Sequence, residues 1–139
     1  MKDNQALIVV DVQKDFLETG ALPVKDGSQV VPVINRISPK FKHVVFTQDW
    51  HPQGHISFAS SHPGKAPYST IDVSYGKQVL WPEHCVQNTV GAEFADGLNT
   101  ENGDCFVKKG AHSDIDSYSA FLEADRKTKT DLGVWLKSQ

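Results

Sequence analysis

Apolar residues form two uninterrupted runs of strand length in the first third of the chain. Residues 6–11 are five apolar residues followed by Asp11, and residues 43–49 form a second, mainly apolar run that ends at Asp49. Runs without polar alternation are typical of strands that are buried on both faces of a parallel sheet. We therefore predict two such strands, with Asp11 and Asp49 at their carboxyl ends.

The segment between these strands has the pattern of an amphipathic helix. Apolar residues recur at i, i+3, i+4 and i+7, namely Val30, Val33, Ile34 and Ile37. Pro32 is compatible with a helix only near its first turn, and Pro39 helps to end it. Strand, helix and strand then form a βαβ unit, whose ligands bind at the carboxyl ends of the strands.

The remainder of the chain is less regular. Residues 50–103 contain many Gly and Pro residues and little periodicity, but also aromatic and histidine residues, which favour an ordered, functional loop. Residues 104–109 are predicted to form a third strand. A last helix is predicted from about Thr130, with Leu132, Trp135 and Leu136 on one face. Beside only three strands, Trp135 and Leu136 are expected to have little sheet to cover, so the architecture looks interrupted.

The composition is that of an ordinary globular protein. The 139 residues are 39% hydrophobic and 22% charged, and residues 1–139 are expected to belong to one domain. A net charge of −3 with no basic stripe argues against nucleic acid or membrane as a partner. The apolar run of residues 6–10 is too short for a signal peptide or a membrane span. Two cysteines make no disulfide framework, so we expect a cytoplasmic protein.

Three residues form a candidate metal site. Asp49 and His51 lie two positions apart at the end of a predicted strand, and His84 would add a second imidazole. Two imidazoles and a carboxylate suit Zn²⁺, Mn²⁺ or Fe²⁺. The spacing alone is a weak signal, because an acid and a histidine exposed in a loop would look the same. The same reservation applies to His55 and to His62, which we expect to be a solvated loop residue.

Asp11 and Lys109 are a second candidate group. A partly buried carboxylate with a raised pKa could act as a general base, although most such acids cap helices or anchor loops. Lys109 ends the third predicted strand and could reach Asp11 across the sheet. The alternative is a solvated lysine at a strand end, which is what we expect of Lys108.

Five segments match the motifs of a known family in the correct order. The chain resembles the nicotinamidases of the isochorismatase-like cysteine hydrolase family over its whole length, and several ordered motifs are far more specific than one. The matching segments are Asp11-Val12-Gln13-Lys14-Asp15-Phe16, Gln48-Asp49-Trp50-His51-Pro52, Trp81-Pro82-Glu83-His84-Cys85-Val86-Gln87, Lys108-Lys109-Gly110 and Asp116-Ser117-Tyr118-Ser119-Ala120-Phe121.

The resemblance implies a fold and a set of catalytic residues. The fold is a three-layer α/β/α domain with a mainly parallel sheet, and this chain would be its N-terminal part, with about three of the six strands. Asp11 would be the general base of an Asp-Lys-Cys triad and Lys109 its lysine. Phe16 and Trp81 would flank the aromatic ring of the substrate.

The resemblance also implies a cofactor and a reaction. Asp49, His51 and His84 would bind one divalent metal ion, zinc in the first place and manganese or iron as alternatives, while the participation of His55 stays open. The reaction would convert nicotinamide to nicotinate and ammonia through a thioester, as in NAD salvage, and analogues such as pyrazinamide would also react.

The family's nucleophilic cysteine would follow Gln139, so we predict that this chain alone is inactive. The first strand would then have an open edge, and self-association is expected. Two other interpretations remain: another isochorismatase-like hydrolase that acts on a different amide or ester, and a metal-binding or partner-binding fragment without activity.

Overall fold

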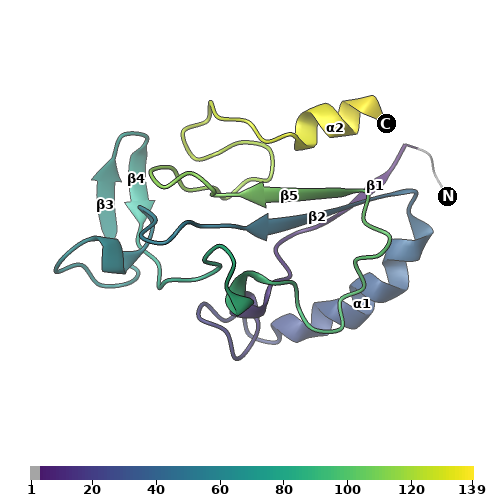
Figure 1. Cartoon of the computed structure of the whole chain (residues 1–139), viewed down its shortest axis with the longest axis horizontal. Helices are drawn as coiled ribbons and strands as arrows, with labels where there is room; N and C mark the ends of the chain where they lie inside the picture. The colour runs from purple at the N-terminus through teal and green to yellow at the C-terminus, as the bar shows by residue number, and fades with distance from the viewer. Residues whose placement is uncertain (1–3) are drawn as a thin grey trace.

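A parallel three-stranded sheet forms the centre of the molecule in the computed structural model, which describes residues 4–139 (Figure 1). Its strands are β1 (Ala6–Val9), β2 (His43–Asp49) and β5 (Cys105–Lys109), in the order β1-β2-β5. Both β1 and β5 pair with β2 in parallel. The three predicted strands are therefore confirmed, with the third beginning one residue later than predicted.

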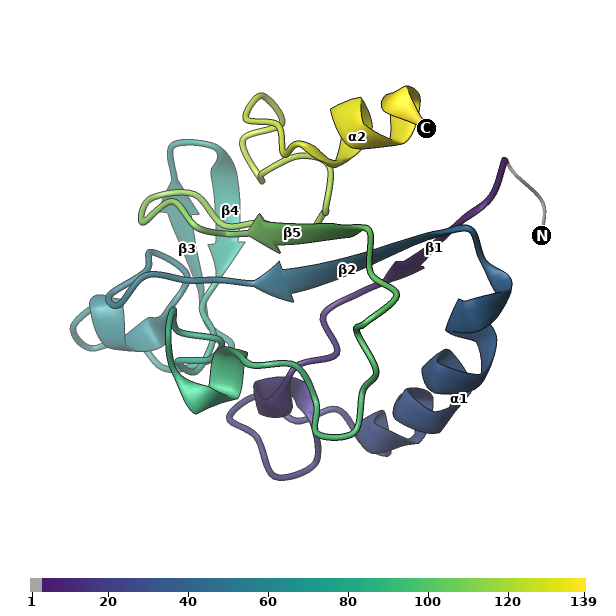
Figure 2. The same ribbon diagram turned by 45° about the vertical axis from the view of Figure 1, so that its right-hand side comes forward.

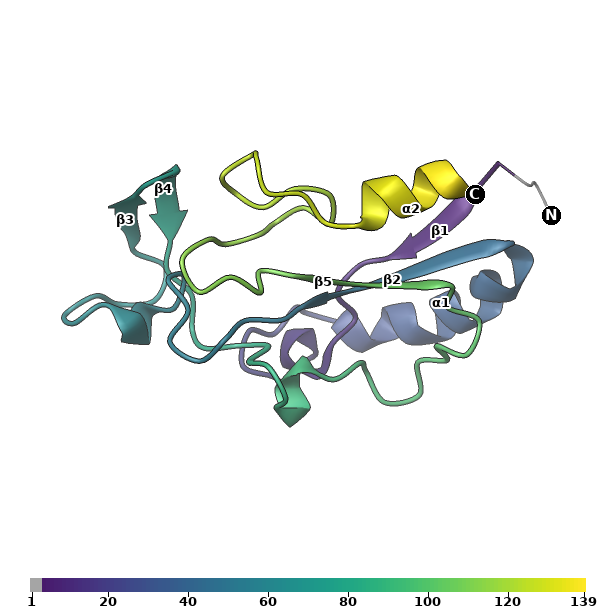
Figure 3. The same ribbon diagram turned by 45° about the horizontal axis from the view of Figure 1, so that its top comes forward.

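Helices cover both faces of this sheet, which gives the expected three layers. Helix α1 (Val30–Ile37) lies on one face and helix α2 (Leu132–Ser138) on the other, as Figures 1 and 3 show. Side chains alternate along a strand, so Val44 and Phe46 join the apolar cluster beneath α1, while Val45 joins the cluster beneath α2.

Helix α1 has the predicted bounds. Val31 and Ile34 pack against the sheet, whereas Val30 and Val33 are 43% and 44% exposed. Pro32 is its third residue, where a backbone N–H has no partner within the helix, so the ring costs no hydrogen bond.

Helix α2 differs from the prediction in two respects. It begins at Leu132 rather than at Thr130, and the Thr130 hydroxyl accepts a hydrogen bond from the Leu132 N–H at 3.3 Å. The expectation that Trp135 and Leu136 have little to cover is wrong. Both pack with Leu132 on the cluster that contains Val45, because all three strands contribute apolar side chains to this face, including Ile8 of β1 and Val107 of β5.

Strand β1 lies at an edge of the sheet, as the family resemblance implied for this chain, but it is not buried on both faces as its apolar run predicted. Its only described neighbour is β2, and three of its four residues are partly exposed. Val10, just after the strand, is 58% exposed. The central position belongs to β2, in which every residue after His43 is buried.

Residues 50–103 are ordered and contain a hairpin that the sequence did not predict. Strands β3 (Thr70–Val73) and β4 (Gly76–Val79) pair antiparallel at the end of the molecule to which β2 and β5 point (Figure 2). The described part of the chain also forms five short 3₁₀ turns, at Lys14–Phe16, Gly27–Gln29, Ser38–Lys40, Ala59–Ser61 and Val90–Ala92. Within residues 4–139, neither helix is long and apolar enough to cross a membrane.

Candidate active site

The carboxyl ends of the three strands bring two acids and a lysine together. Asp49 and Lys109 are register partners at the ends of β2 and β5. Asp11 follows β1 with a φ of 53°, and its N–H donates to the carbonyl and the hydroxyl of Thr47, both at 3.2 Å. Lys109 Nζ lies 2.8 Å from Asp11 Oδ2 and also donates to Asp49 Oδ1.

The two acids differ in their affinity for a proton. Burial disfavours the charge of Asp49, but a hydrogen bond from His84 and the charge of Lys109 outweigh it, so the pKa of Asp49 falls to about 2. At Asp11, burial raises the pKa, and the charge of Lys109 offsets this only in part. Burial also disfavours the Lys109 ammonium, yet the two acids outweigh it and raise the pKa of Lys109. Asp11 is therefore the acid of this pair that accepts a proton more readily.

The three candidate metal ligands converge on one point. Asp49 Oδ2 lies 3.8 Å from His51 Nε2 and 3.7 Å from His84 Nε2, and all three residues are buried. His84 reaches the site because its segment pairs with residue 51: the His51 N–H donates to the Cys85 carbonyl at 3.0 Å, and the Gln87 N–H donates to the His51 carbonyl at 2.8 Å.

The hydrogen bonds of both imidazoles fit metal binding. His51 Nδ1 donates to the Gly110 carbonyl at 2.9 Å, and His84 Nδ1 donates to the Pro82 carbonyl at 2.7 Å. Since a carbonyl only accepts, Nδ1 carries a proton in each ring. In the neutral imidazole Nε2 then has a lone pair that faces Asp49, which is the usual arrangement behind metal-ligating histidines, whereas the protonated His84 ring donates from Nε2 to Asp49 instead. Donor atoms around tetrahedral zinc lie about 3.4 Å apart, so the two distances from Asp49 Oδ2 need only a small contraction.

His55 belongs to a different set of contacts. It forms a second compact group with His51 and Asp116, whose possible ligand atoms all lie within 4.8 Å of one another. However, His55 Nε2 donates to the Ile115 carbonyl at 3.1 Å, and His55 Nδ1 is hydrogen-bonded to the Ser57 hydroxyl at 2.7 Å. Both ring nitrogens are thus engaged, and the geometry favours Asp49, His51 and His84 as the ligand set.

His62 is not the solvated loop residue that we expected. Its side chain is partly buried, and Nε2 donates to the Ile56 carbonyl at 2.7 Å. The 3₁₀ turn at Ala59–Ser61 folds the chain back, so that His62 packs on the preceding segment.

All seven site residues chosen from the sequence line one cavity of about 240 Å³. They are Asp11, Phe16, Asp49, His51, Trp81, His84 and Lys109, and four residues without a predicted role complete the wall, namely Leu22, Asp116, Ser117 and Tyr118. Three of these four lie in the segment of residues 116–121 that matches the last family motif. That match was the feature of the sequence that could have identified them as cavity residues.

Aromatic side chains form part of the cavity wall and its support. The Phe16 ring lies 5.5 Å from the His84 ring, centroid to centroid. Trp81 is fixed through its backbone, since its N–H donates to the Ser57 carbonyl at 2.7 Å and its carbonyl accepts from the Ala59 N–H at 2.9 Å. Phe58, fully buried, packs edge-on against His51 and His84 and was not predicted.

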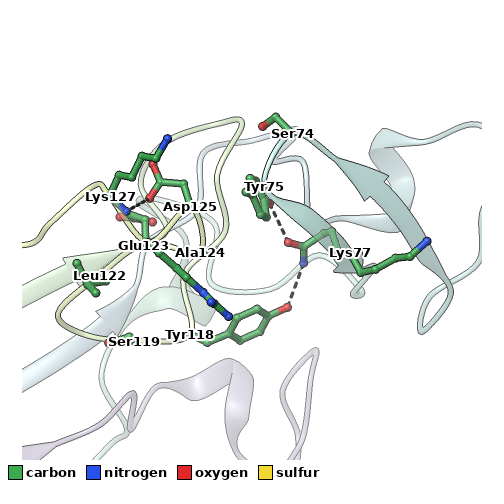
Figure 4. Close-up of a pocket in the computed structure, with 12 residues that line it drawn as sticks. Ser74, Tyr75, Lys77, Tyr118, Ser119, Leu122, Glu123, Ala124, Asp125 and Lys127 are labelled. Atoms are coloured by element: carbon green, nitrogen blue, oxygen red, sulfur yellow. Dashed lines mark hydrogen bonds between the residues drawn. The ribbon is translucent and has the colours of Figure 1, made fainter.

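A larger hollow of about 1050 Å³ lies between the β3–β4 hairpin and the loop of residues 118–127 (Figure 4). Tyr118 borders both hollows. Its hydroxyl accepts hydrogen bonds from Gln78 Nε2 at 3.0 Å and from Trp81 Nε1 at 3.1 Å. Tyr118 therefore lies between the cavity that contains the candidate site residues and this larger hollow.

Neither cysteine lines the cavity. Cys85 is completely buried, and this burial, together with the charge of Asp49, raises the pKa of its thiol. Cys105 begins β5 opposite Val45, at the other end of the strand from Lys109. Neither thiol is placed or activated as a nucleophile.

Comparison with known proteins identifies relatives of the whole chain. Residues 5–138 match the isochorismatase domain. A nicotinamidase of Acinetobacter baylyi is 52% identical over 99% of this chain, which spans 64% of that relative. The Escherichia coli nicotinamidase is 41% identical over 96% of the chain, again over 64% of the relative's length. The chain thus spans slightly less than two thirds of the curated relatives that it matches.

Solved structures have the same fold. A nicotinamidase/pyrazinamidase of Acinetobacter baumannii superposes with a TM-score of 0.97 at 51% identity, over 99% of this chain and 67% of that one. A Pyrococcus horikoshii pyrazinamidase, solved in complex with zinc, superposes with a TM-score of 0.69 at 38% identity, over 96% of this chain and 63% of that one. With its sheet, its two covering helices and this domain match, the chain belongs to the isochorismatase family.

Proposed function

We propose that this chain, joined to the remaining third that its relatives have (referred to below as the full-length protein), hydrolyses nicotinamide to nicotinate and ammonia, and that residues 4–139 supply most of the active site within one hydrolase domain. The observation that carries the proposal is the single cavity in which the Asp11–Lys109 pair, the Asp49–His51–His84 group and two aromatic side chains meet. It is supported by relatives that are nicotinamidases.

The Asp11–Lys109 pair would move the proton. The resemblance to nicotinamidases implies a cysteine nucleophile, and Asp11 would accept its proton as the sulfur bonds to the carboxamide carbon. The same proton would leave with ammonia as the C–N bond breaks, and water would then release nicotinate from the thioester. Lys109 would hold Asp11 in place and favour the thiolate by its charge.

The remaining residues would bind and orient the substrate. Phe16 and Trp81 would cover the faces of the pyridine ring, because an aromatic ligand needs apolar walls with a few polar anchors. A divalent ion bound by Asp49, His51 and His84 would fix the ring through its nitrogen. Zinc is the first candidate, supported by the zinc complex of the Pyrococcus relative and by the nitrogen-rich ligand set.

Metal content tests the ligand assignment. We expect about one divalent ion per full-length protein, and replacement of His51 or His84 by Ala should remove most of it, since each change deletes one of three ligands. His62→Ala is the matched control, because His62 contacts the Ile56 carbonyl and lies outside the cavity. Unchanged metal content in both the His51→Ala and the His84→Ala proteins would contradict the assignment.

Steady-state kinetics test the aromatic wall. Trp81→Ala should raise KM for nicotinamide roughly 10-fold or more, since an apolar wall of this size contributes about 1.5–3 kcal/mol. Trp81→Phe keeps the apolar wall and loses only the N–H bond to Tyr118, so it should restore most of the affinity. Equal KM values for the Trp81→Ala and unaltered proteins would assign Trp81 to loop packing instead.

A further inference from the structure

The candidate metal ligands come from two segments that are distant in the sequence. Asp49 and His51 follow β2, whereas His84 lies in the long connection before β5. A metal site needs its ligands within a few tenths of an ångström of their working positions. The structure therefore has to hold both segments, and residues 13–15, just after β1, contact each of them.

Gln13 holds the backbone of Asp49. Its side-chain amide is completely buried; Nε2 donates to the Asp49 carbonyl at 2.8 Å, and Oε1 accepts from the Asp49 N–H at 2.8 Å. The pairing of β1 with β2 ends at Val9 and Phe46. Gln13 thus provides for Asp49 the donor and acceptor that a neighbouring strand would have provided.

The same amide also ties Asp49 to a third segment. Gln13 Nε2 donates to the Ala92 carbonyl at 2.9 Å, and Gln48 Nε2 donates to that carbonyl at the same distance. The Gln48 amide does not bond the main chain of Asp49, so the two glutamines share the Ala92 carbonyl as an acceptor but only Gln13 holds Asp49. The difference supplies a matched control.

Asp15 holds the segment that carries His84. Its Oδ2 accepts from the Cys85 N–H at 2.7 Å, one residue after His84. Cys85 has a φ of 47°, a left-handed conformation that costs a non-glycine residue about 1 kcal/mol. A hydrogen bond at this residue stabilises the turn. A Cβ at Gly91 would clash with Asp15 Oδ2, so only glycine leaves room for the carboxylate in this position.

We propose that Gln13 and Asp15 are positioning residues that fix the two halves of the metal site relative to each other. Neither lines the cavity, so each acts through a ligand: Gln13 through Asp49 and Asp15 through His84. The inference rests on the metal site of the proposed function. It adds that loss of either contact weakens metal binding although all three ligands remain.

The test measures the dissociation constants of Zn²⁺ and Co²⁺ with the full-length protein, by chelator competition and by the visible absorption of Co²⁺. Gln13→Met removes both contacts with Asp49. Gln13→Glu keeps an acceptor for the Asp49 N–H but replaces the donor by a carboxylate oxygen that faces the Asp49 and Ala92 carbonyls. We expect about 10–100-fold weaker binding, as for other residues that support metal ligands, and an altered Co²⁺ spectrum. Gln48→Met keeps the contacts between Gln13 and Asp49, so it should change both the metal dissociation constant and the Co²⁺ spectrum much less.

Asp15 is tested independently, which covers the case in which a Gln13 variant does not fold. Asp15→Ala should weaken binding to a similar extent, and Asp15→Asn, which keeps an acceptor for Cys85, should restore part of it. Gly91→Ala should resemble Asp15→Ala, because it displaces the carboxylate.

The outcomes separate this inference from the proposed function. If the unaltered protein binds metal and the Gln13 and Asp15 variants bind it as tightly as Gln48→Met, the positioning inference is overturned and the metal site stands. If the unaltered protein binds neither ion, the metal site itself is wrong, and the inference is overturned with it.

Discussion

Replacing Asp11 with Asn is expected to lower kcat for nicotinamide by about 10³-fold or more. Asn has nearly the same size and can keep a contact with Thr47, whose hydroxyl donates to Asp11 Oδ1 at 2.6 Å. It cannot accept the proton of the nucleophile, and general acid–base catalysis contributes about 10²–10⁴-fold. The measurement is ammonia release under saturating nicotinamide.

Lys109 should behave as part of the same unit. Lys109→Ala leaves Asp11 and Asp49 buried without their shared cation, so its effect on kcat should approach that of Asp11→Asn without adding to it. Lys108→Ala is the control, because the Lys108 ammonium lies 3.7 Å over the Trp50 ring and outside the cavity. If Asp11→Asn keeps more than about a tenth of the unaltered rate, Asp11 is not the general base.

The second large effect concerns the nucleophile. We expect the isolated chain of 139 residues to show no measurable turnover of nicotinamide with added Zn²⁺, Mn²⁺ or Fe²⁺. Neither Cys85 nor Cys105 faces the Asp11–Lys109 pair from the cavity wall, and burial raises the pKa of Cys85. Water in place of a positioned thiolate should cost many orders of magnitude in rate.

Cysteine substitutions in the full-length protein complete this test. Cys85→Ser and Cys105→Ser should each keep most of the activity, because neither sulfur takes part in the reaction. Turnover by the isolated chain at roughly 1 per second or faster, or loss of all turnover in either Ser variant, would place the nucleophile at one of these cysteines and contradict the proposed triad.

The sequence predicted those elements whose apolar residues form a run or a regular spacing over seven or more positions. The apolar run of β2 predicted a buried strand, and the helical spacing of Val30, Val33 and Ile34 predicted α1. The bounds of both elements in the structure agree with the prediction. The β3–β4 hairpin has only four residues in each strand. Thr70–Val73 alternates between exposed and half-buried residues, but over four residues this is too short to distinguish a strand from a loop, and the buried residue of Gly76–Val79 is the polar Gln78. The apolar residues of β1 do not specify its neighbours, so its open edge was expected only from the family resemblance.

The candidate site divides in a similar way. The sequence identified residues at strand ends, such as Asp11, Asp49 and Lys109, because parallel strands bring their carboxyl ends to one edge. It did not reveal how His84 arrives there, since that depends on pairing between residue 51 and the segment after His84. The role of Gln13 could not be predicted either, because a hydrogen bond from a side-chain amide to a distant main chain leaves no pattern in the spacing of residues along the sequence.

One measurement tests the central claim most directly: release of ammonia and nicotinate from nicotinamide by the full-length protein as isolated, after removal of metal, and after addition of Zn²⁺. We predict equal amounts of the two products at roughly 1 per second or faster, loss of turnover with the metal, and recovery with Zn²⁺. A folded protein that binds the metal at Asp49, His51 and His84 but releases no ammonia from nicotinamide would contradict the account.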